Sequence, residues 1–552
     1  MYHRNQHYMI CTQCSSQFDQ PNKEHEVYKR FGAQVPTICP DCRHHRHLIF
    51  RNERNIFYNK SHITGKTIVS MIPPTSPFKV IDQDEWWDDK FDASIYGRDF
   101  DFSKPFFQQF KELQNDVPRW ARLFVNCENS EFTNNSADVK DCYLTFSSYE
   151  SEKLYYCTRV FKSNGCIDCM NVKGSEYCSQ CMDCQKCYNL HYSQSSEGCR
   201  DSYYLYDCRN CKNCILSAQL RNKEYCILNK QYSKQDYEKY KSEFLKNLAD
   251  NRGKTEKKFE ELKKTLDHKH LRLTNTENSF GDFITGSKNI SNGFYIVDCE
   301  DCINVRDCST CKDCYDNLAN EKSELCLEVD TSYELYNSKF CTHCVTNRDI
   351  SYCDQCFKLE DCFGCIGMKQ SKNVILNKKY SEKDYKEIMP KIKEHMIKTG
   401  EWGLPFPKTL TPWPYNIAVA FEHYPLTKEE ALAEGYMWHE EQKEAEYFSE
   451  KYDVSSDIEE VDESICDKIL ICEKTGKNYK VIPQEFKFYK TFGLPIPRIT
   501  PYERYKNLVA LQPSKKLQNV KCHLCNADIQ TTYLEKSGYD VVCDKCYLEK
   551  VY

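Results

Sequence analysis

The sequence lacks the features that would place the chain in a membrane or in the secretory pathway. No apolar run reaches the ~18 residues that a membrane-spanning helix needs. The first residues, MYHRNQHYMI, contain no apolar core of a signal peptide. We therefore expect a cytoplasmic protein. The net charge of −6 also gives the chain no overall attraction to nucleic acid.

The sequence also lacks recognisable catalytic motifs. It contains no evident Ser/His/Asp set, nucleotide-binding fingerprint or paired-carboxylate motif. Thr64-Gly65-Lys66 does not have the spacing of a phosphate-binding loop, and the same tripeptide recurs at Thr475-Gly476-Lys477, which favours a turn in both places. These absences favour a non-enzymatic protein.

Cysteine is the abundant residue: the 552-residue chain has 36, many of them in C-x-x-C pairs. In a reducing compartment such pairs are metal ligands or buried thiols more often than disulfides. The alternative, a secreted disulfide scaffold, would normally be short and carry a signal peptide. The length itself predicts several domains.

Four C-x-x-C pairs form two sets, one near each end of the chain, with the spacing of zinc sites. Each turn presents two thiolates, and two turns complete a tetrahedral Zn²⁺ site. The gap in the first set leaves room for a helix around EHEVYKRFG, as in a treble clef, and the second set matches a zinc ribbon. A redox dithiol is the alternative. The predicted metal ligands are Cys11, Cys14, Cys39, Cys42, Cys522, Cys525, Cys543 and Cys546.

We call each set of two C-x-x-C turns, together with the residues between them, a knuckle. A further copy of the first knuckle appears when residues 11–43 are shifted by 461 positions. Three ligand positions are replaced: Cys11 matches Cys472, but the other three match Thr475, Thr500 and Glu503. We expect no metal there, because structural zinc needs four ligands. The shared residues include Glu24, Tyr28 and Arg43, which match Glu485, Tyr489 and Arg504. An apolar set should keep the shape of this copy as a docking surface: Ile482, Phe486, Tyr489 and Phe492.

The other cysteines concentrate in residues 127–226 and 299–365. Cys157, Cys178 and Cys199 are spaced by 21 residues, which predicts the turns of a β-solenoid, a right-handed β-helix with its handedness left open. Asp-Cys pairs recur, and alternation along a strand would place Cys inside and Asp outside. A ladder of buried thiols is the favoured reading; the alternatives are further metal, or an iron–sulfur or redox site at Cys178, Cys181, Cys184 and Cys187.

The two blocks look duplicated, because CILNKQYSKQDYEK at 226–239 resembles VILNKKYSEKDYKE at 374–387. In each, Ser233 or Ser381 should cap a helix. Residues 234–272 predict a charged helix or a helical hairpin that turns at 251–253. Thr427 should cap a short helix that ends at Gly435.

A stretch after the first knuckle is both basic and aromatic. Such a stretch could stack on and neutralise a single strand of RNA or DNA, although a solvated helix is the plainer interpretation. The candidate nucleic-acid-binding residues are Arg43, Arg46, Arg51 and Arg54.

The first 115 residues resemble the probable zinc-ribbon family through CTQC, VYKRFG, TICPDCRHHR, RNERNIFY and YGRDFDFSKPFF. The whole layout is similar to long cysteine-rich zinc-ribbon proteins of candidate-phyla bacteria, which share NSEFTN, LRNKEYCILNKQYS and CDKCYLEKVY in this order. The resemblance implies zinc binding at the eight cysteines above and a cytosolic bacterial protein. It implies no particular activity.

Together these patterns predict a multidomain, mainly β protein, with terminal zinc-ribbon or treble-clef modules flanking two cysteine-rich β-solenoid blocks. The predicted domains are 1–60, 61–125, 126–232, 233–275, 276–380, 381–440, 441–465 (an acidic linker), 466–512 and 513–552. The predicted function is a zinc-binding scaffold for a macromolecule, with RNA or a ribonucleoprotein favoured over a protein partner. A redox or metal-handling protein, with an iron–sulfur cluster, is the alternative.

Overall fold

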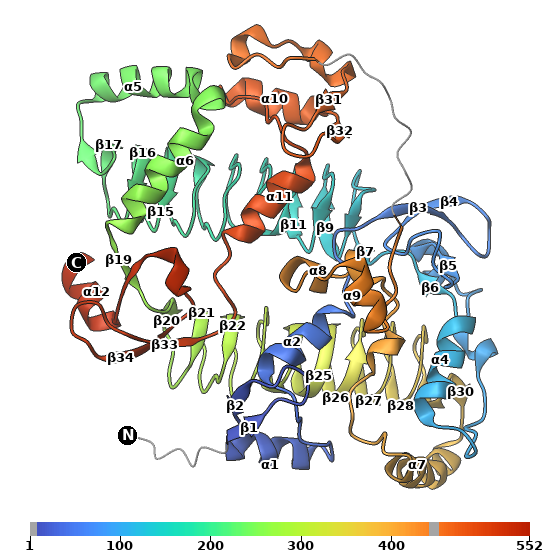
Figure 1. Cartoon of the computed structure of the whole chain (residues 1–552). Coiled ribbons are helices and arrows are strands. Elements are labelled where there is room, and N and C mark those ends of the chain that lie inside the picture. The colour runs from blue at the N-terminus through green and yellow to red at the C-terminus, as the bar shows by residue number, and fades with distance from the viewer. Residues whose placement is uncertain (1–7, 441–451, 552) are drawn as a thin grey trace. The chain divides into compact units, whose positions relative to one another are not determined.

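The computed structural model describes residues 8–440 and 452–551 (Figure 1). Part of the predicted acidic linker, 441–451, lies outside the described residues. The chain divides into two compact units. The first combines the residues up to Arg122 with Leu271–Glu440 and Lys515–Leu517; the second combines Leu123–His270 with the described residues from 452 to Ser514 and from Gln518 onward. Within residues 8–440 and 452–551, every helix is too short or too polar to cross a membrane.

The second unit contains a block of parallel strands, which we call the first parallel block. Paired residues lie twelve positions apart, as in Leu190 with Ser202 and Cys214 with Cys226. Its last two strands turn back as an antiparallel hairpin. The strands are β7 (Phe124–Val125), β8 (Thr133–Asn134), β9 (Ser136–Lys140), β10 (Thr145–Phe146), β11 (Tyr149–Glu152), β12 (Thr158–Phe161), β13 (Met170–Lys173), β14 (Tyr188–His191), β15 (Arg200–Tyr206), β16 (Lys212–Ala218), β17 (Glu224–Ile227) and β18 (Lys230–Gln231).

The first unit contains the second parallel block, built in the same way. Its first step is eleven residues, from Leu273 to Ile284, and the following steps are twelve. The strands are β20 (Leu273–Thr274), β21 (Gly281–Thr285), β22 (Gly293–Val297), β23 (Lys312–Tyr315), β24 (Leu318–Glu321), β25 (Glu324–Tyr333), β26 (Tyr336–Thr342), β27 (Arg348–Ser351), β28 (Glu360–Phe363), β29 (Lys372–Ile375) and β30 (Lys378–Lys379).

A three-residue rhythm explains the cysteine spacing in both blocks. From Asn135 to Leu228, and again from Phe283 to Leu376, every third residue has positive φ. The block cysteines occupy the position after such a residue. The predicted repeat of 21 residues is therefore wrong: 21 is seven of these short steps, whereas strands pair at a step of twelve.

The same rhythm accounts for the recurring Asp-Cys pairs. The Asp of each pair, for example Asp141, Asp183 and Asp361, has φ near +50°. Asp and Asn tolerate this left-handed conformation better than most residues, because their short polar side chains bond locally. The predicted arrangement, with Cys inside and Asp toward the surface, holds for every pair but one, although these bends rather than strand alternation produce it. The exception is Asp168, which is buried at 1% exposure.

Small side chains fill the inside of each block. All 36 cysteines are free thiols, and nearly all of those in the blocks are buried, as the sequence predicted. Successive steps place Cys157, Cys169 and Cys181 twelve residues apart along the first block. Their thiols donate to main-chain carbonyls; Cys181 Sγ, for example, lies 3.1 Å from the carbonyl oxygen of Leu190.

Helices follow both parallel blocks. Ser233 caps α5 (Lys234–Lys246) and Ser381 caps α7 (Glu382–Lys398), each through a 3.1 Å hydrogen bond, as predicted. The charged segment after Ser233 is indeed broken, but at Asn247. Gly253, where we predicted the turn, lies inside α6 (Leu248–Lys264), which packs on β16. The predicted cap at Thr427 is confirmed, and together with Glu430 it forms a capping box at the start of α9 (Lys428–Ala433).

Small modules complete each unit. The first unit holds β1 (Tyr8–Ile10), β2 (Gln17–Asp19), α1 (Asn22–Arg30), α2 (Pro40–Leu48), β3 (Phe57–Lys60), β4 (Thr67–Ser70), β5 (Val80–Ile81), α3 (Gln83–Trp87), α4 (Phe106–Asp116), β6 (Arg119–Trp120) and α8 (Ala420–His423). The second holds β19 (Asp267–Lys269), β31 (Leu470–Ile471), β32 (Asn478–Tyr479), α10 (Pro483–Phe492), α11 (Pro501–Ala510), β33 (Gln518–Lys521), β34 (Asp528–Thr531), β35 (Asp540–Val542) and α12 (Asp544–Val551).

Candidate metal centres

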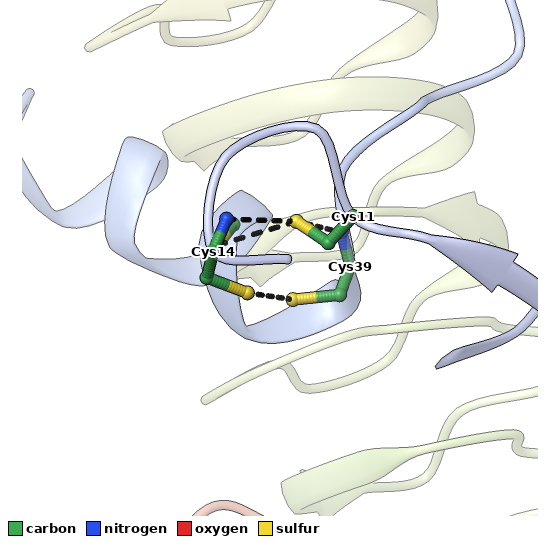
Figure 2. Close-up of side chains that lie close together, drawn as sticks. Cys11, Cys14 and Cys39 are labelled. Atoms are coloured by element: carbon green, nitrogen blue, oxygen red, sulfur yellow. Dashed lines mark hydrogen bonds between the residues drawn. The ribbon is translucent and has the colours of Figure 1, made fainter. Parts of the chain in front are cut away.

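The four predicted ligands near the N-terminus converge in space. Cys11 and Cys14 lie in the turn between β1 and β2, and Cys39 lies directly before α2, with its sulfur toward that of Cys14 (Figure 2). Cys42 follows in the first turn of α2. The sulfurs of Cys11 and Cys42 are 3.7 Å apart, as are those of Cys14 and Cys39. A tetrahedral zinc ion with Zn–S distances of about 2.3 Å would set its sulfurs about 3.8 Å apart. The four thiols therefore fit a metal ion of this size.

Main-chain amides favour the thiolate form at this site. The Cys14 and Cys39 amides point at the sulfur of Cys11, at 3.5 and 3.3 Å. Burial alone would raise the pKa of Cys11, but these amides outweigh it and lower the pKa to about 6. Metals bind the thiolate form, so main-chain amides that stabilise the thiolate of Cys11 also favour metal binding.

The second set repeats this geometry in the other unit. Cys522 and Cys525 lie in the turn between β33 and β34, and Cys543 and Cys546 lie at the start of α12. The sulfurs of Cys525 and Cys543 are 3.7 Å apart, and the Cys543 amide lies 3.3 Å from the sulfur of Cys522. Burial alone would again raise the pKa of Cys522, but hydrogen bonds from main-chain amides outweigh it and lower the pKa to about 6.

No other set of three or more candidate ligand atoms comes within 4.8 Å of one another in the described part of the chain. Cys178, Cys181, Cys184 and Cys187, the candidates for an iron–sulfur site, are at most 2% exposed inside the first parallel block. Their thiols donate to carbonyl oxygens, as from Cys184 to Met182 at 3.3 Å. These contacts suit neutral thiols in a packed interior.

The third copy, residues 470–510, keeps the main chain of the knuckle but only one of its four ligand cysteines, Cys472; we call it the metal-free copy because structural zinc needs four ligands. The amide of Gly476 donates to the carbonyl of Cys472 at 2.9 Å, as the amide of Ser15 does to Cys11. Thr500 now caps α11 and accepts from the Glu503 amide at 3.2 Å. The predicted apolar set is confirmed: Phe486 and Tyr489 are buried, and Ile482 and Phe492 pack against the same core.

A buried ion network docks the first knuckle onto the second parallel block. Arg43, 1% exposed, pairs with Glu24 of α1 and lies 2.8 Å from Asp316 of the block. The hydroxyl of Tyr28 donates to Asp316 at 2.5 Å and to Glu328 at 3.0 Å. Burial, partly offset by Arg43, raises the pKa of Asp316 to about 6.

The metal-free copy docks onto the first parallel block through the same residue types. Arg504 lies 2.7 Å from Glu485 of its own module and 3.1 Å from Asp168 of the block. Tyr489 donates to Asp168 at 3.3 Å. Burial raises the pKa of Asp168 to about 6, with Arg504 opposing and Glu485 adding to the shift. The arginines of the two networks, Arg43 and Arg504, lie 461 positions apart in the sequence. The block residues that they meet, Asp316 and Asp168, lie 148 positions apart.

Among the arginines predicted to bind nucleic acid, Arg43, Arg46 and Arg51 form ion pairs inside the first unit. Arg43 is held as described above, and Arg51, 3% exposed, pairs with Glu53 and Asp330. Arg46 forks onto the two carboxylate oxygens of Glu328, at 2.6 and 2.7 Å. Arg54 is half-buried. The exposed part of the basic-aromatic stretch is instead the β3–β4 hairpin, where Tyr58 is 66% exposed and Lys60 and Lys66 are also exposed.

Sequence reasoning missed the carboxylates of the parallel blocks that receive the knuckles: Asp168, Asp316 and Glu328. The signal was present in two offsets. The knuckle copies share Glu, Tyr and Arg at a shift of 461, the blocks repeat at a shift of 148, and the two Asp positions obey the second shift. Neither offset alone shows which residues of the two repeats meet.

Comparison with known proteins adds no family to this description. No protein-family model matches the chain, and no curated protein matches it.

Proposed function

We propose that the chain is a zinc-stabilised, non-enzymatic scaffold in which two β-solenoid blocks carry small docked knuckles that present a surface to a macromolecule. The observation that carries this proposal is the closed thiol set in each unit. Four cysteines with sulfur spacings of 3.7 Å leave a bound ion no open position for a substrate. Zinc is the ion that such tetrahedral sulfur sites most often hold.

Twelve-residue registers support the solenoid part of the proposal. Beyond the named strands, isolated parallel bridges such as Ile167 with Ser179 and Glu300 with Lys312 keep the same step. A coil of twelve residues with bends every three would have four short sides, with small residues inside. Buried Cys and Ser at these positions fit so narrow an interior.

RNA, alone or in a ribonucleoprotein, is the proposed partner, and the β3–β4 hairpin is its proposed site. Tyr58 and Lys60 alternate with less exposed residues along β3, so they share one face, and Lys66 lies in the turn that leads to β4. An aromatic ring offers a base a stacking surface, and lysines neutralise phosphates. This hairpin follows directly from the first knuckle, where the sequence is basic and aromatic.

A binding assay with a fluorescent single-stranded RNA at several salt concentrations tests this site. Lys60→Glu/Lys66→Glu should weaken binding and flatten the log–log salt slope by about 1.4, since each phosphate contact on a single strand contributes about 0.7. Lys257→Glu/Lys258→Glu on the exposed side of α6 makes the same change in charge and should leave binding unchanged. If the parent protein shows no salt-sensitive binding, RNA is excluded and a protein partner becomes the next candidate.

A further inference from the structure

One main-chain pattern recurs in four hairpin turns of the described chain, which join β1 to β2, β3 to β4, β31 to β32 and β33 to β34. In each of these turns, an amide donates to the carbonyl four residues earlier, and the donor residue has positive φ. The four hydrogen bonds, each 2.9 Å long, are Ser15 to Cys11, Gly65 to Ser61, Gly476 to Cys472 and Asn526 to Cys522. Three of these turns belong to knuckles already described. The fourth, at Ser61, does not.

The segment 57–87 matches the C-terminal knuckle position by position at the same shift of 461. Strands β3 and β4 pair in the same register as β33 and β34. The amide of His62 donates to the carbonyl of Val80 at 2.7 Å, and the amide of His523 donates to the carbonyl of Val541 at 2.9 Å. Strand β5 pairs in parallel with β6, as β35 does with β19. The two segments differ at all four ligand positions.

At the four ligand positions this segment has Ser61, Thr64, Asp82 and Glu85 where the C-terminal knuckle has Cys522, Cys525, Cys543 and Cys546. The Glu85 carboxylate accepts hydrogen bonds from both hydroxyls, that of Ser61 and, at 2.5 Å, that of Thr64. It also accepts from the amide of Asp82 at 3.1 Å, which completes a capping box at the start of α3. Burial alone would raise the pKa of Glu85, but these hydrogen bonds outweigh it and lower the pKa.

We infer that residues 57–87 are a fourth copy of the knuckle, in which the carboxylate of Glu85 joins the two turns in place of a metal ion. A metal bound by a cysteine knuckle would join the hairpin turn to the N-terminus of the helix. Here Glu85, in the first helical turn of α3, accepts hydrogen bonds from the two hydroxyls of the hairpin turn. The metal-free copy at Cys472 uses a related solution, since Thr500 and Glu503 occupy the same cap positions of α11.

Each unit therefore combines one cysteine knuckle with one metal-free knuckle. The first unit has residues 8–54 with four cysteines and 57–87 without them; the second has 518–551 with four cysteines and 470–510 with only one. Removal of metal should loosen one module of each unit and spare the other.

The first test restores the ligands in the full-length protein. The variant Ser61→Cys/Thr64→Cys/Asp82→Cys/Glu85→Cys should bind one more zinc ion per chain than the parent when both are titrated with zinc alone. Asp82→Cys/Glu85→Cys leaves the hydroxyls of Ser61 and Thr64 at the other two positions, so it supplies only half of the ligands and is the matched control; it should gain no tightly held ion. A quadruple variant that keeps the circular dichroism spectrum of the parent but gains no zinc would overturn the inference.

If the quadruple variant fails to fold, amide hydrogen exchange in the parent and in single Glu85 variants tests the inference instead. In the parent, a chelator should speed amide exchange in 8–19 and 518–531 and leave 57–70 unchanged, whereas faster exchange in 57–70 would contradict a metal-free module. Glu85→Ala should speed exchange in 61–66 by about tenfold or more, and Glu85→Gln by less, because its amide oxygen still accepts hydrogen bonds. Equal exchange in parent and Glu85→Ala also counts against the inference.

The inference rests on the proposed function, because it compares residues 57–87 with a proposed zinc site. The zinc titration distinguishes failure of the inference from failure of the proposed function. A parent without bound zinc whose quadruple variant gains one ion refutes the proposed function and supports the inference. A parent that binds zinc and a folded quadruple variant that gains no further ion would support the proposed zinc sites and refute the inference.

Discussion

The docking network of the metal-free knuckle gives a prediction in which two neighbouring charges act in opposite ways. Arg504 is the cation shared by two buried carboxylates, Glu485 and Asp168. Arg504→Met leaves both carboxylates without that cation, and breaking a buried ion pair in this way costs about 3–5 kcal/mol. We therefore expect Arg504→Met to destabilise the docked state of residues 470–510 by that amount at pH 7.

Asp168→Asn should behave differently, because it removes the surplus negative charge. The pKa of Asp168 is raised to about 6 in the folded protein, against about 3.9 in an unfolded chain. The folded state thus holds a proton between pH 4 and 6 that the unfolded state has released, so stability falls as the pH rises through 6, by about 3 kcal/mol in total. Asp168→Asn should be at least as stable as the parent at pH 7 and should lose this dependence on pH.

Hydrogen exchange of the α10 amides measures both effects, since these amides report the opening of a module that has no predicted metal site. The parent should open less readily at pH 5 than at pH 7 after correction for the intrinsic exchange rate. Unchanged protection of α10 in Arg504→Met would refute the docking role of the network. A large loss of protection in Asp168→Asn at pH 7 would refute the charge balance that we assign to it.

Two further predictions concern the metal and the blocks. Cys11→Ser should remove one zinc ion per chain and loosen the N-terminal knuckle, because metal binding and folding are coupled there, whereas Cys472→Ser should leave the zinc content unchanged; equal zinc loss in both variants would contradict the ligand assignment. Asp183 has φ of +54°, so Asp183→Val should lower the free energy of unfolding by about 1–2 kcal/mol, while Asp183→Gly should be tolerated; denaturant titration compares the two, and equal stability would argue against the left-handed bends.

Much of the architecture could be predicted from the sequence, because it depends on local patterns. C-x-x-C spacing placed eight ligands in two sets that the structure brings together. Ser and Thr followed three residues later by an acidic residue predicted the starts of α5, α7 and α9. Buried thiols followed from cysteine abundance without a disulfide-forming context.

The errors have physical causes. We took the 21-residue spacing for the repeat, because the true step of twelve is built from three-residue bends that no strand or helix periodicity describes. We placed the helix break at Gly253, but glycine is tolerated inside a helix at a modest cost. We named Arg43 as a candidate nucleic-acid-binding residue, whereas it is buried between Glu24 of its own knuckle and Asp316, which is far from it in sequence.

Metal analysis of anaerobically purified full-length protein, together with its visible spectrum, tests the central claim most directly. The account predicts two tightly held zinc ions per chain, one for each set of four cysteines, and a colourless protein. A brown protein that contains iron and acid-labile sulfide, with less than one zinc ion per chain, would contradict it and favour the redox alternative.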